Sequence, residues 1–145
     1  MRFMVFMIPD PKAYEAGAMP TDEAIAGMMK YNEDLAKSGI LLGADGLAPS
    51  ARGARIKFSG GKSTVIDGPF TETKEIIGGY WIWQCKSKAE AIEWARRCPD
   101  DQNCTIELRQ IYEMSDFGPA VEVQEAARVE TISKAMDANK QPGKA

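Results

Sequence analysis

An apolar run near the N-terminus, followed by an amphipathic stretch, limits the folds that the chain can adopt. Residues 2–8, RFMVFMI, are apolar at almost every position, which is typical of a strand buried on both faces and central in a sheet. Residues 21–38 then place apolar side chains along one face of a helix, after Thr21 as the N-cap and before Gly39 at the C-terminal end. The prolines and the glycine of residues 9–20 predict a loop between these two elements.

The rest of the chain repeats the pattern, with a hairpin inserted after its second strand. In order, we expect a strand from residue 40, hairpin strands at 55–58 and 63–67 joined by Gly60-Gly61, an aromatic strand at 80–85, a helix at 87–97 and a last strand at 105–112. The alternation within residues 55–58 is typical of a half-exposed strand. Ser87 and Glu90 form a capping box at the start of the second helix. The hairpin apart, the order is β-α-β-β-α-β, which is the ferredoxin-like pattern.

A sheet of this kind is covered by its two helices on one face only. We expect the other face to carry large side chains such as Trp81 or Trp83, which leaves an apolar patch that requires a partner. A second copy of the chain, related by a two-fold axis, covers such a patch directly. We therefore expect an α+β fold: a ferredoxin-like βαββαβ domain with an inserted β-hairpin and a C-terminal helix, which pairs into a dimeric α+β barrel with a ligand cavity between the sheets. Trp81, Trp83 and Trp94 are expected in the core and the dimer interface rather than around a cofactor.

The composition of the chain changes after Tyr112. Residues 122–138 predict a further helix, which has too few apolar positions to support a domain of its own. Its narrow apolar stripe consists of Val129, Ile132 and Met136. We expect residues 1–113 to form the ferredoxin-like domain. Residues 114–145 are expected to form a helical extension with a frayed tail, which packs on the domain or on the partner subunit.

The composition argues against several classes of function. A net charge of −3 provides no basic surface for direct binding to nucleic acid. The three cysteines have no C-x-x-C spacing, so we expect small buried side chains rather than disulfides or a zinc site. The absence of histidine excludes His-based catalysis and His metal ligands. The N-terminal apolar run is too short for a signal peptide or a membrane span. The expectation is a cytoplasmic protein with no metal, no cofactor and no membrane association.

The densest polar stretch is residues 67–75, DGPFTETKE, between the hairpin and the aromatic strand. It holds three candidate catalytic carboxylates, Asp67, Glu72 and Glu75, around the ammonium group of Lys74. Burial beside Lys74 would keep one carboxylate ionised and raise the pKa of another, as acid–base chemistry requires. The alternative is an ordinary Asp-Gly-Pro turn in which Asp67 caps the next segment.

Other positions near this stretch allow two interpretations each. Gly78-Gly79 either admits a ligand close to the backbone or forms a bend before the strand. Arg52 and Arg55 either bind an anion or are solvated charges on an edge strand. Asp45 lies beside two glycines and is expected to face the same cavity. The candidate ligand-binding residues are Asp45, Asp67, Gly68, Pro69, Phe70, Glu72, Lys74, Gly78 and Gly79.

The segment 65–75, followed by Gly78-Gly79-Tyr80, resembles the signature of the DGPF-domain proteins of the YCII-related superfamily. Residues 46–49 and 106–109 agree with it, and residues 113–118 resemble a subgroup with a helical extension. The resemblance implies a dimeric α+β barrel with a pocket near the DGPF loop. The YCII branch is associated with enzymatic activity through a His–Asp pair, which a chain without histidine does not share. DGPF proteins tend to be encoded beside extracytoplasmic-function sigma factors, which implies a regulatory or stress-related link.

Three functions therefore stay open at the level of sequence. The first is a homodimeric pocket protein that binds a small molecule and has an accessory or regulatory role. The second is a cofactor-independent enzyme, such as a lyase, an isomerase or a monooxygenase-like protein, with Asp67, Glu72 or Glu75 as acid or base and Lys74 setting the charge. The third is a protein-interaction module linked to a sigma factor.

Overall fold

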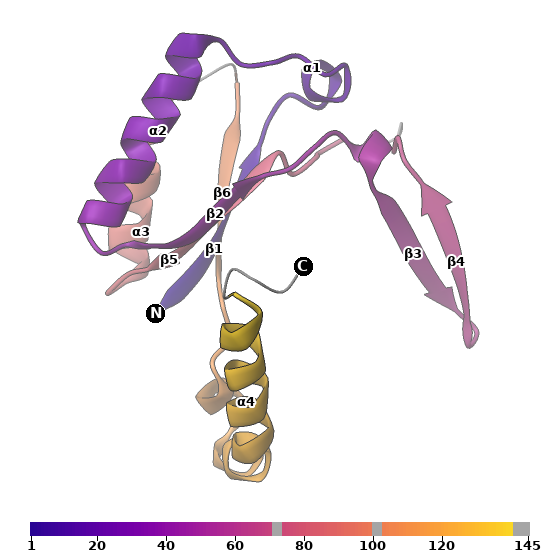
Figure 1. Cartoon of the computed structure of the whole chain (residues 1–145), viewed down its shortest axis with the longest axis vertical. Helices are drawn as coiled ribbons and strands as arrows, with labels where there is room; N and C mark the ends of the chain where they lie inside the picture. The colour runs from indigo at the N-terminus through magenta and orange to yellow at the C-terminus, as the bar shows by residue number, and fades with distance from the viewer. Residues whose placement is uncertain (71–73, 100–102, 141–145) are drawn as a thin grey trace. The chain divides into compact units, whose positions relative to one another are not determined.

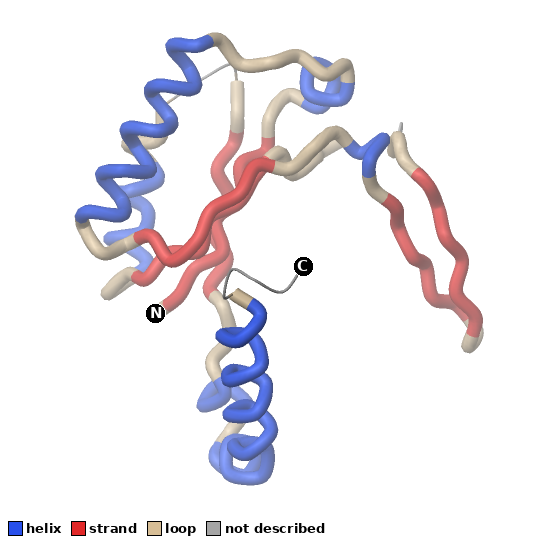
Figure 2. Tube along the Cα trace, in the orientation of Figure 1, coloured by secondary structure: helices blue, strands red, loops and turns tan. Residues whose placement is uncertain are grey.

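The computed structural model of the chain describes residues 1–70, 74–99 and 103–140. These residues fall into two compact units, one of Met1–Ile111 and one that begins at Tyr112. Figure 1 labels the helices and strands of both units, and Figure 2 distinguishes helix, strand and loop along the chain.

A four-stranded antiparallel sheet forms the centre of the first unit. Its strand order is β2-β5-β1-β6. The bounds are Arg2–Ile8 for β1, Leu41–Gly46 for β2, Gly79–Gln84 for β5 and Thr105–Gln110 for β6. The strand predicted at residues 2–8 is confirmed, and it lies between β5 and β6 as its apolar composition indicated.

Two helices cover one face of this sheet: α2, Asp22–Lys37, and α3, Lys88–Ala95. The hydroxyl of Thr21 accepts a hydrogen bond from the N–H of Ala24 at 3.2 Å, and so caps α2 as predicted. At the start of α3 the Ser87 hydroxyl accepts from the N–H of Glu90 at 3.1 Å. The Glu90 carboxylate accepts from the N–H of Lys86 at 2.6 Å, one residue before the position that a regular capping box uses.

The loop predicted at residues 9–20 is partly wrong, because Pro11–Glu15 form a short helix, α1. The Asp10 carboxylate accepts a hydrogen bond from the N–H of Ala13 at 2.8 Å and caps this helix. Pro11 occupies the first helical position, where its fixed φ fits and its missing N–H costs nothing. The proline that was interpreted as a loop signal is therefore a helix-start signal.

The core lies between the sheet and the two helices, and it contains Trp81 and Trp83, which are 5% and 0% exposed. The ring of Tyr31 on α2 packs edge-on against both indoles, with centroid distances of 6.2 and 6.5 Å. The indole N–H of Trp81 donates to Asn32 at 2.7 Å. Trp94 is half-buried and packs against this core.

The expectation that Trp81 or Trp83 lies on the bare face of the sheet is therefore wrong. Trp83 pairs with Phe3 across the strands, and both side chains point toward the helices. Alternate residues of a strand point to opposite faces, so the other face carries a different set of large side chains. Its central positions are Met4, Phe6, Tyr80 and Ile82, all half-buried. We call these four residues the open-face cluster.

The predicted hairpin is confirmed, with strands β3, Ala54–Ser59, and β4, Lys62–Asp67. Gly60 and Gly61 form its turn with φ values of +57° and +74°, as a tight two-residue turn requires. The strands are not half-exposed as expected, because every residue of both is exposed. Ser50–Arg52 form a 3-10 turn, η1, just before the hairpin.

The second unit contains a short 3-10 turn, η2, Met114–Phe117, and a long helix, α4, Pro119–Asn139. The helix predicted at residues 122–138 is confirmed and begins earlier, with a proline at its first position. Its stripe of Val129, Ile132 and Met136 is exposed. Along the described residues, no helix combines the length and apolarity that crossing a bilayer demands.

Replacing Leu35 on α2 by alanine is expected to lower the free energy of unfolding by about 3 kcal/mol, because this side chain is completely buried in the core. The matched control is Leu42→Ala, since Leu42 is 55% exposed. Urea denaturation followed by circular dichroism measures both variants. Equal losses for the two variants would contradict the location of the core.

Candidate functional site

The Asp67–Phe70 turn is attached to η1 through its backbone. The N–H of Gly68 donates to the carbonyl oxygen of Gly53 at 3.0 Å, and the N–H of Phe70 donates to the Ser50 hydroxyl at 2.9 Å. A Cβ atom on Gly68 would lie 1.7 Å from the carbonyl oxygen of Ser50. Any side chain at position 68 would therefore force the turn away from η1.

Ser50 also joins this turn to α1. Its N–H donates to one carboxylate oxygen of Glu15 at 2.9 Å, and its hydroxyl donates to the other at 2.5 Å. The same hydroxyl accepts from Phe70, so both its donor and its acceptor roles are used. The buried Ser50 is thus held by hydrogen bonds to Glu15 on one side and to the N–H of Phe70 on the other. We call these three residues the polar clamp.

A cavity of about 650 Å³ lies beside this clamp. Its wall consists of Asp10, Pro11, Lys12, Glu15, Ala16, Pro69 and Phe70. Two predicted pocket residues, Pro69 and Phe70, therefore border a cavity, while Asp67 and Lys74 are exposed and lie outside its wall. The cavity combines carboxylates, one ammonium group and an aromatic ring.

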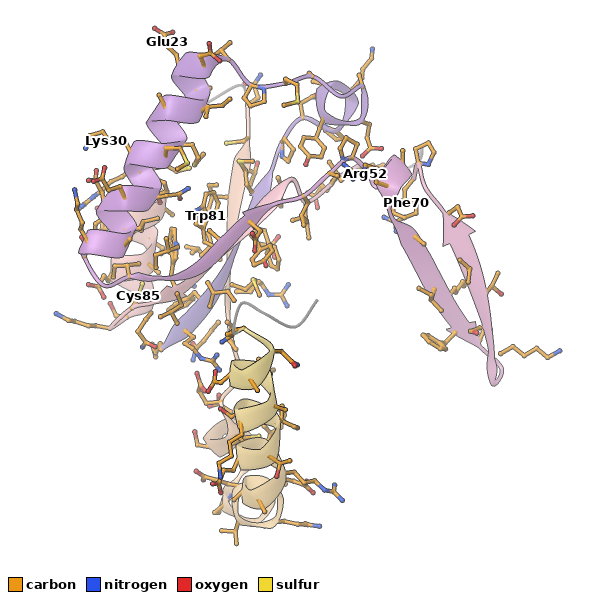
Figure 3. The ribbon with its side chains drawn as sticks, in the orientation of Figure 1. Glu23, Lys30, Arg52, Phe70, Trp81 and Cys85 are labelled. Atoms are coloured by element: carbon orange, nitrogen blue, oxygen red, sulfur yellow. The ribbon has the colours of Figure 1, made fainter. Side chains whose placement is uncertain are left out.

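The two arginines beside the turn differ in their surroundings. The guanidinium group of Arg55 lies over the Phe70 ring, 3.9 Å from its centroid, in a cation–π contact. Arg52 ends η1 and is exposed. Figure 3 labels Arg52 and Phe70 where η1 leads into the hairpin. Arg55 is also exposed on β3, which agrees with a solvated charge on an edge strand, and the cation–π contact adds a partner that the sequence did not indicate.

Gly78 admits another part of the chain close to its backbone. Its N–H donates to Met7 and its carbonyl oxygen accepts from Leu47, both at 2.8 Å. A Cβ atom here would lie 2.9 Å from the Pro9 ring and 3.1 Å from the Tyr14 ring. The Tyr14 hydroxyl lies within hydrogen-bonding reach of the carbonyl oxygens of Leu47 and Gly78. Burial, and to a smaller extent the charge of Glu15, raise the pKa of this hydroxyl.

Asp45 and Tyr80 form a pair across β2 and β5. The Tyr80 hydroxyl donates to the Asp45 carboxylate at 2.9 Å. This hydrogen bond raises the pKa of Tyr80, because the adjacent negative charge disfavours a phenolate. A cavity of about 170 Å³ adjoins the pair, and Gly79 contributes to its wall. Asp45 and Gly79 thus border a different cavity from Pro69 and Phe70.

Two of the candidate catalytic carboxylates, Asp67 and Glu75, lie in different exposed segments of the described chain. Asp67 ends β4 and Glu75 lies in the irregular segment before β5, and both are exposed. Lys74 is exposed in the same segment. Glu72 lies outside the described residues. The three-carboxylate acid–base site therefore stays a prediction.

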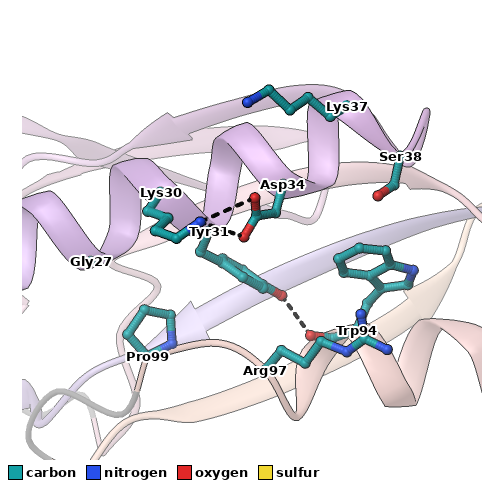
Figure 4. A pocket seen from close by; sticks show the side chains of 9 residues that line it. All are labelled: Gly27, Lys30, Tyr31, Asp34, Lys37, Ser38, Trp94, Arg97 and Pro99. Carbon is teal, nitrogen blue, oxygen red and sulfur yellow. Dashed lines mark hydrogen bonds and ion pairs between the residues drawn. The ribbon is translucent and has the colours of Figure 1, made fainter.

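A further cleft, of about 470 Å³, separates α2 from α3 and is shown in Figure 4. Its bottom is closed by a hydrogen bond from the Tyr31 hydroxyl to the carbonyl oxygen of Trp94 at 2.8 Å. Its cations are already engaged: Lys30 pairs with Asp34 at 3.3 Å, and Arg97 lies 4.5 Å from the centroid of the Trp94 ring. The Tyr31–Trp94 hydrogen bond therefore connects α2 with α3 across the cleft.

Sequence reasoning missed Glu15, Ser50, Tyr14 and Tyr80. The first two interact across 35 residues of sequence, and α1, which carries Glu15 and Tyr14, was expected to be a loop. The available signal for Glu15 and Tyr14 was Pro11, because proline is common at the first position of a helix. Tyr80 was included in the aromatic strand, but its face of the sheet was not identified.

Metal-ligating residue types are spread out: within residues 1–70, 74–99 and 103–140, no three or more His, Cys, Asp or Glu side chains gather in a way that would hold a metal ion.

Residues 1–115 match the model of the YCII-related domain. Over 50 residues the chain is 42% identical to a curated relative described as uncharacterized protein R00369, from Rhizobium meliloti (strain 1021). That alignment covers 34% of this chain and 40% of the relative, so the chain corresponds to less than half of that protein's length.

Replacing Gly68 by alanine is expected to lower the free energy of unfolding by about 1–3 kcal/mol, because the new methyl group would collide with the backbone of Ser50. The matched control is Gly43→Ala, since a Cβ at Gly43 meets open space. Chemical denaturation should leave the control within about 0.5 kcal/mol of the wild type. If the two variants are equally stable, the turn does not pack on η1 as described.

Proposed function

The chain belongs to the YCII-related domain family, and we propose that it is a cytoplasmic homodimer of the DGPF type that binds a small molecule between its two sheets. In this proposal each subunit is a ferredoxin-like domain, and the open faces of two sheets pair into an α+β barrel. The strand order β2-β5-β1-β6, with α2 and α3 on one face, supports the ferredoxin-like assignment.

The observation that carries the proposal is the open-face cluster. Met4 is paired with Ile82 and Phe6 with Tyr80, so four large side chains form one continuous patch on the two central strands. Gln84, Glu107 and Arg109 on the same face supply polar groups around the patch. An apolar centre with a polar rim is the usual composition of a protein interface. A second copy of the chain presents the same patch, so that its apolar centre would cover this apolar centre and its polar rim would meet this polar rim.

The Asp45–Tyr80 pair supports ligand binding on this face. Both side chains belong to the open face, at the outer side of β5, and Asp45 is exposed. The pair offers a carboxylate and a protonated hydroxyl beside the apolar ring of Phe6. A small molecule with a hydrogen-bonding group and an apolar body matches these surroundings.

Binding is favoured over acid–base catalysis. Asp67 and Glu75 are both exposed, so neither lies in the enclosed, water-excluding surroundings in which a catalytic carboxylate usually works. The raised pKa of Tyr80 keeps its hydroxyl protonated at neutral pH, where it donates a hydrogen bond rather than removing a proton. The resemblance to DGPF proteins implies an accessory or regulatory role with a functional link to a sigma factor.

Ile82→Lys is expected to convert the dimer into a monomer, because an unpaired ammonium group in an apolar interface is strongly unfavourable. Light scattering after gel filtration should give twice the chain mass of 15.9 kDa for the wild type and the single mass for the variant. Gln84→Lys is the control, since Gln84 lies on the same strand and face but is already exposed. A wild-type monomer at micromolar concentration would refute the dimer.

A thermal-shift screen with a metabolite library tests ligand binding. A compound that binds the native state raises the melting temperature, and the shift grows with the logarithm of the ligand concentration once that concentration exceeds Kd. We expect the shift of a true ligand to fall in Asp45→Ala, which removes the carboxylate of the pair, and to persist in Asp67→Ala. A shift that is lost only in Asp67→Ala would favour the carboxylate cluster of residues 67–75 instead.

A further inference from the structure

A second cavity, of about 310 Å³, lies on the helix-covered side of the sheet, among α1, the first half of α2 and the end of β1. It is separate from the proposed pocket between the sheets, because Met7 in its wall points to the same face of β1 as the buried Val5. Its volume lies at the lower end of the range for small-molecule sites.

The wall of this cavity is rich in methionine. Met7, Met19, Met28 and Met29 all contribute, which is half of the chain's eight methionines. Thioether side chains are flexible and polarisable, and they contact the edges of aromatic rings favourably. Because these side chains are flexible, the wall has no fixed shape and can adapt to a flat apolar molecule.

The polar groups of the wall are already engaged. The Asp10 carboxylate caps α1 by accepting the N–H of Ala13. The Tyr14 hydroxyl is directed to the carbonyl oxygens of Leu47 and Gly78. Asp10 carries the one formal charge among the described wall residues at neutral pH, and it is negative. The negative charge of Asp10 disfavours an anionic ligand. An uncharged apolar ligand can bind without a polar partner in the wall.

The mouth of the cavity exposes large apolar side chains. Met19 is 83%, Met29 63% and Ile25 44% exposed. Apolar groups gathered around an opening in this way indicate a binding site rather than ordinary surface.

We propose that this cavity binds an uncharged aromatic small molecule, held by the methionines of α2 and β1. This site lies on the helix-covered side of the sheet, opposite the face proposed for the dimer, and it shares Met7 and Met28 with the small cavity beside Asp45 and Tyr80. Cys104, which is half-buried in the wall, provides a chemical reporter of its occupancy.

The experiment uses the full chain and N-phenyl-1-naphthylamine, an uncharged aromatic amine whose fluorescence rises in apolar surroundings. We expect saturable binding of one probe per chain. Ala24→Phe fills the cavity from α2 and should weaken binding at least about tenfold. Ala26→Phe is the matched control, because Ala26 lies on the same helix, is exposed and is absent from the wall. Melting curves establish that both variants fold.

A second measurement does not depend on either variant. Alkylation of Cys104 by N-ethylmaleimide, followed by peptide mass spectrometry, should slow severalfold when the probe is saturating. Three results would overturn the proposal: no saturable binding, equal binding by Ala24→Phe and Ala26→Phe, or unchanged alkylation of Cys104. Binding that is lost in Ile82→Lys but kept in Ala24→Phe would assign the probe to the open sheet face, which supports the dimer pocket and rejects this cavity.

Discussion

The packing of two β5 tryptophans beneath α2 determines what the rest of the first unit can present. Trp83 is fully buried, and no hydrogen-bond partner for its indole nitrogen is found among the described residues, so packing alone holds it. Trp81 is fixed further by its hydrogen bond to Asn32. Because side chains alternate along a strand, these inward positions send Tyr80 and Ile82 to the opposite face. The open-face cluster is thus a direct consequence of the core.

Helix α1 organises the other end of the sheet although it has only five residues. One side of it carries Glu15, which holds Ser50 and borders the cavity beside Phe70. The other side carries Tyr14, which reaches the backbone at Leu47 and Gly78 and borders the methionine-rich cavity. This short helix therefore lies between two cavities, one lined partly by charged side chains and the other mainly by apolar ones.

Local signals in the sequence were enough to predict most elements, because caps, apolar periodicity and paired glycines act over a few residues. Thr21 and the Gly60-Gly61 turn are examples. The face of β5 could not be predicted in this way, since both of its faces are rich in large apolar side chains and alternation gives no preference between them. Phe70 and Asp45 border two different cavities rather than the single one expected, and the Glu15–Ser50 contact joins distant segments and leaves no local trace.

The exposed hairpin has a consequence for solubility. One face of the hairpin carries Ile56, Phe58 and Val65, and the opposite face carries Arg55, Lys57 and Lys62. Each of its two strands has an outer edge whose backbone groups are open to a further strand, which is the usual starting point of edge-to-edge aggregation. The clustered positive charges repel an identical ribbon that approaches on that side. At high salt this repulsion is screened, and edge-to-edge pairing of the ribbon becomes more favourable.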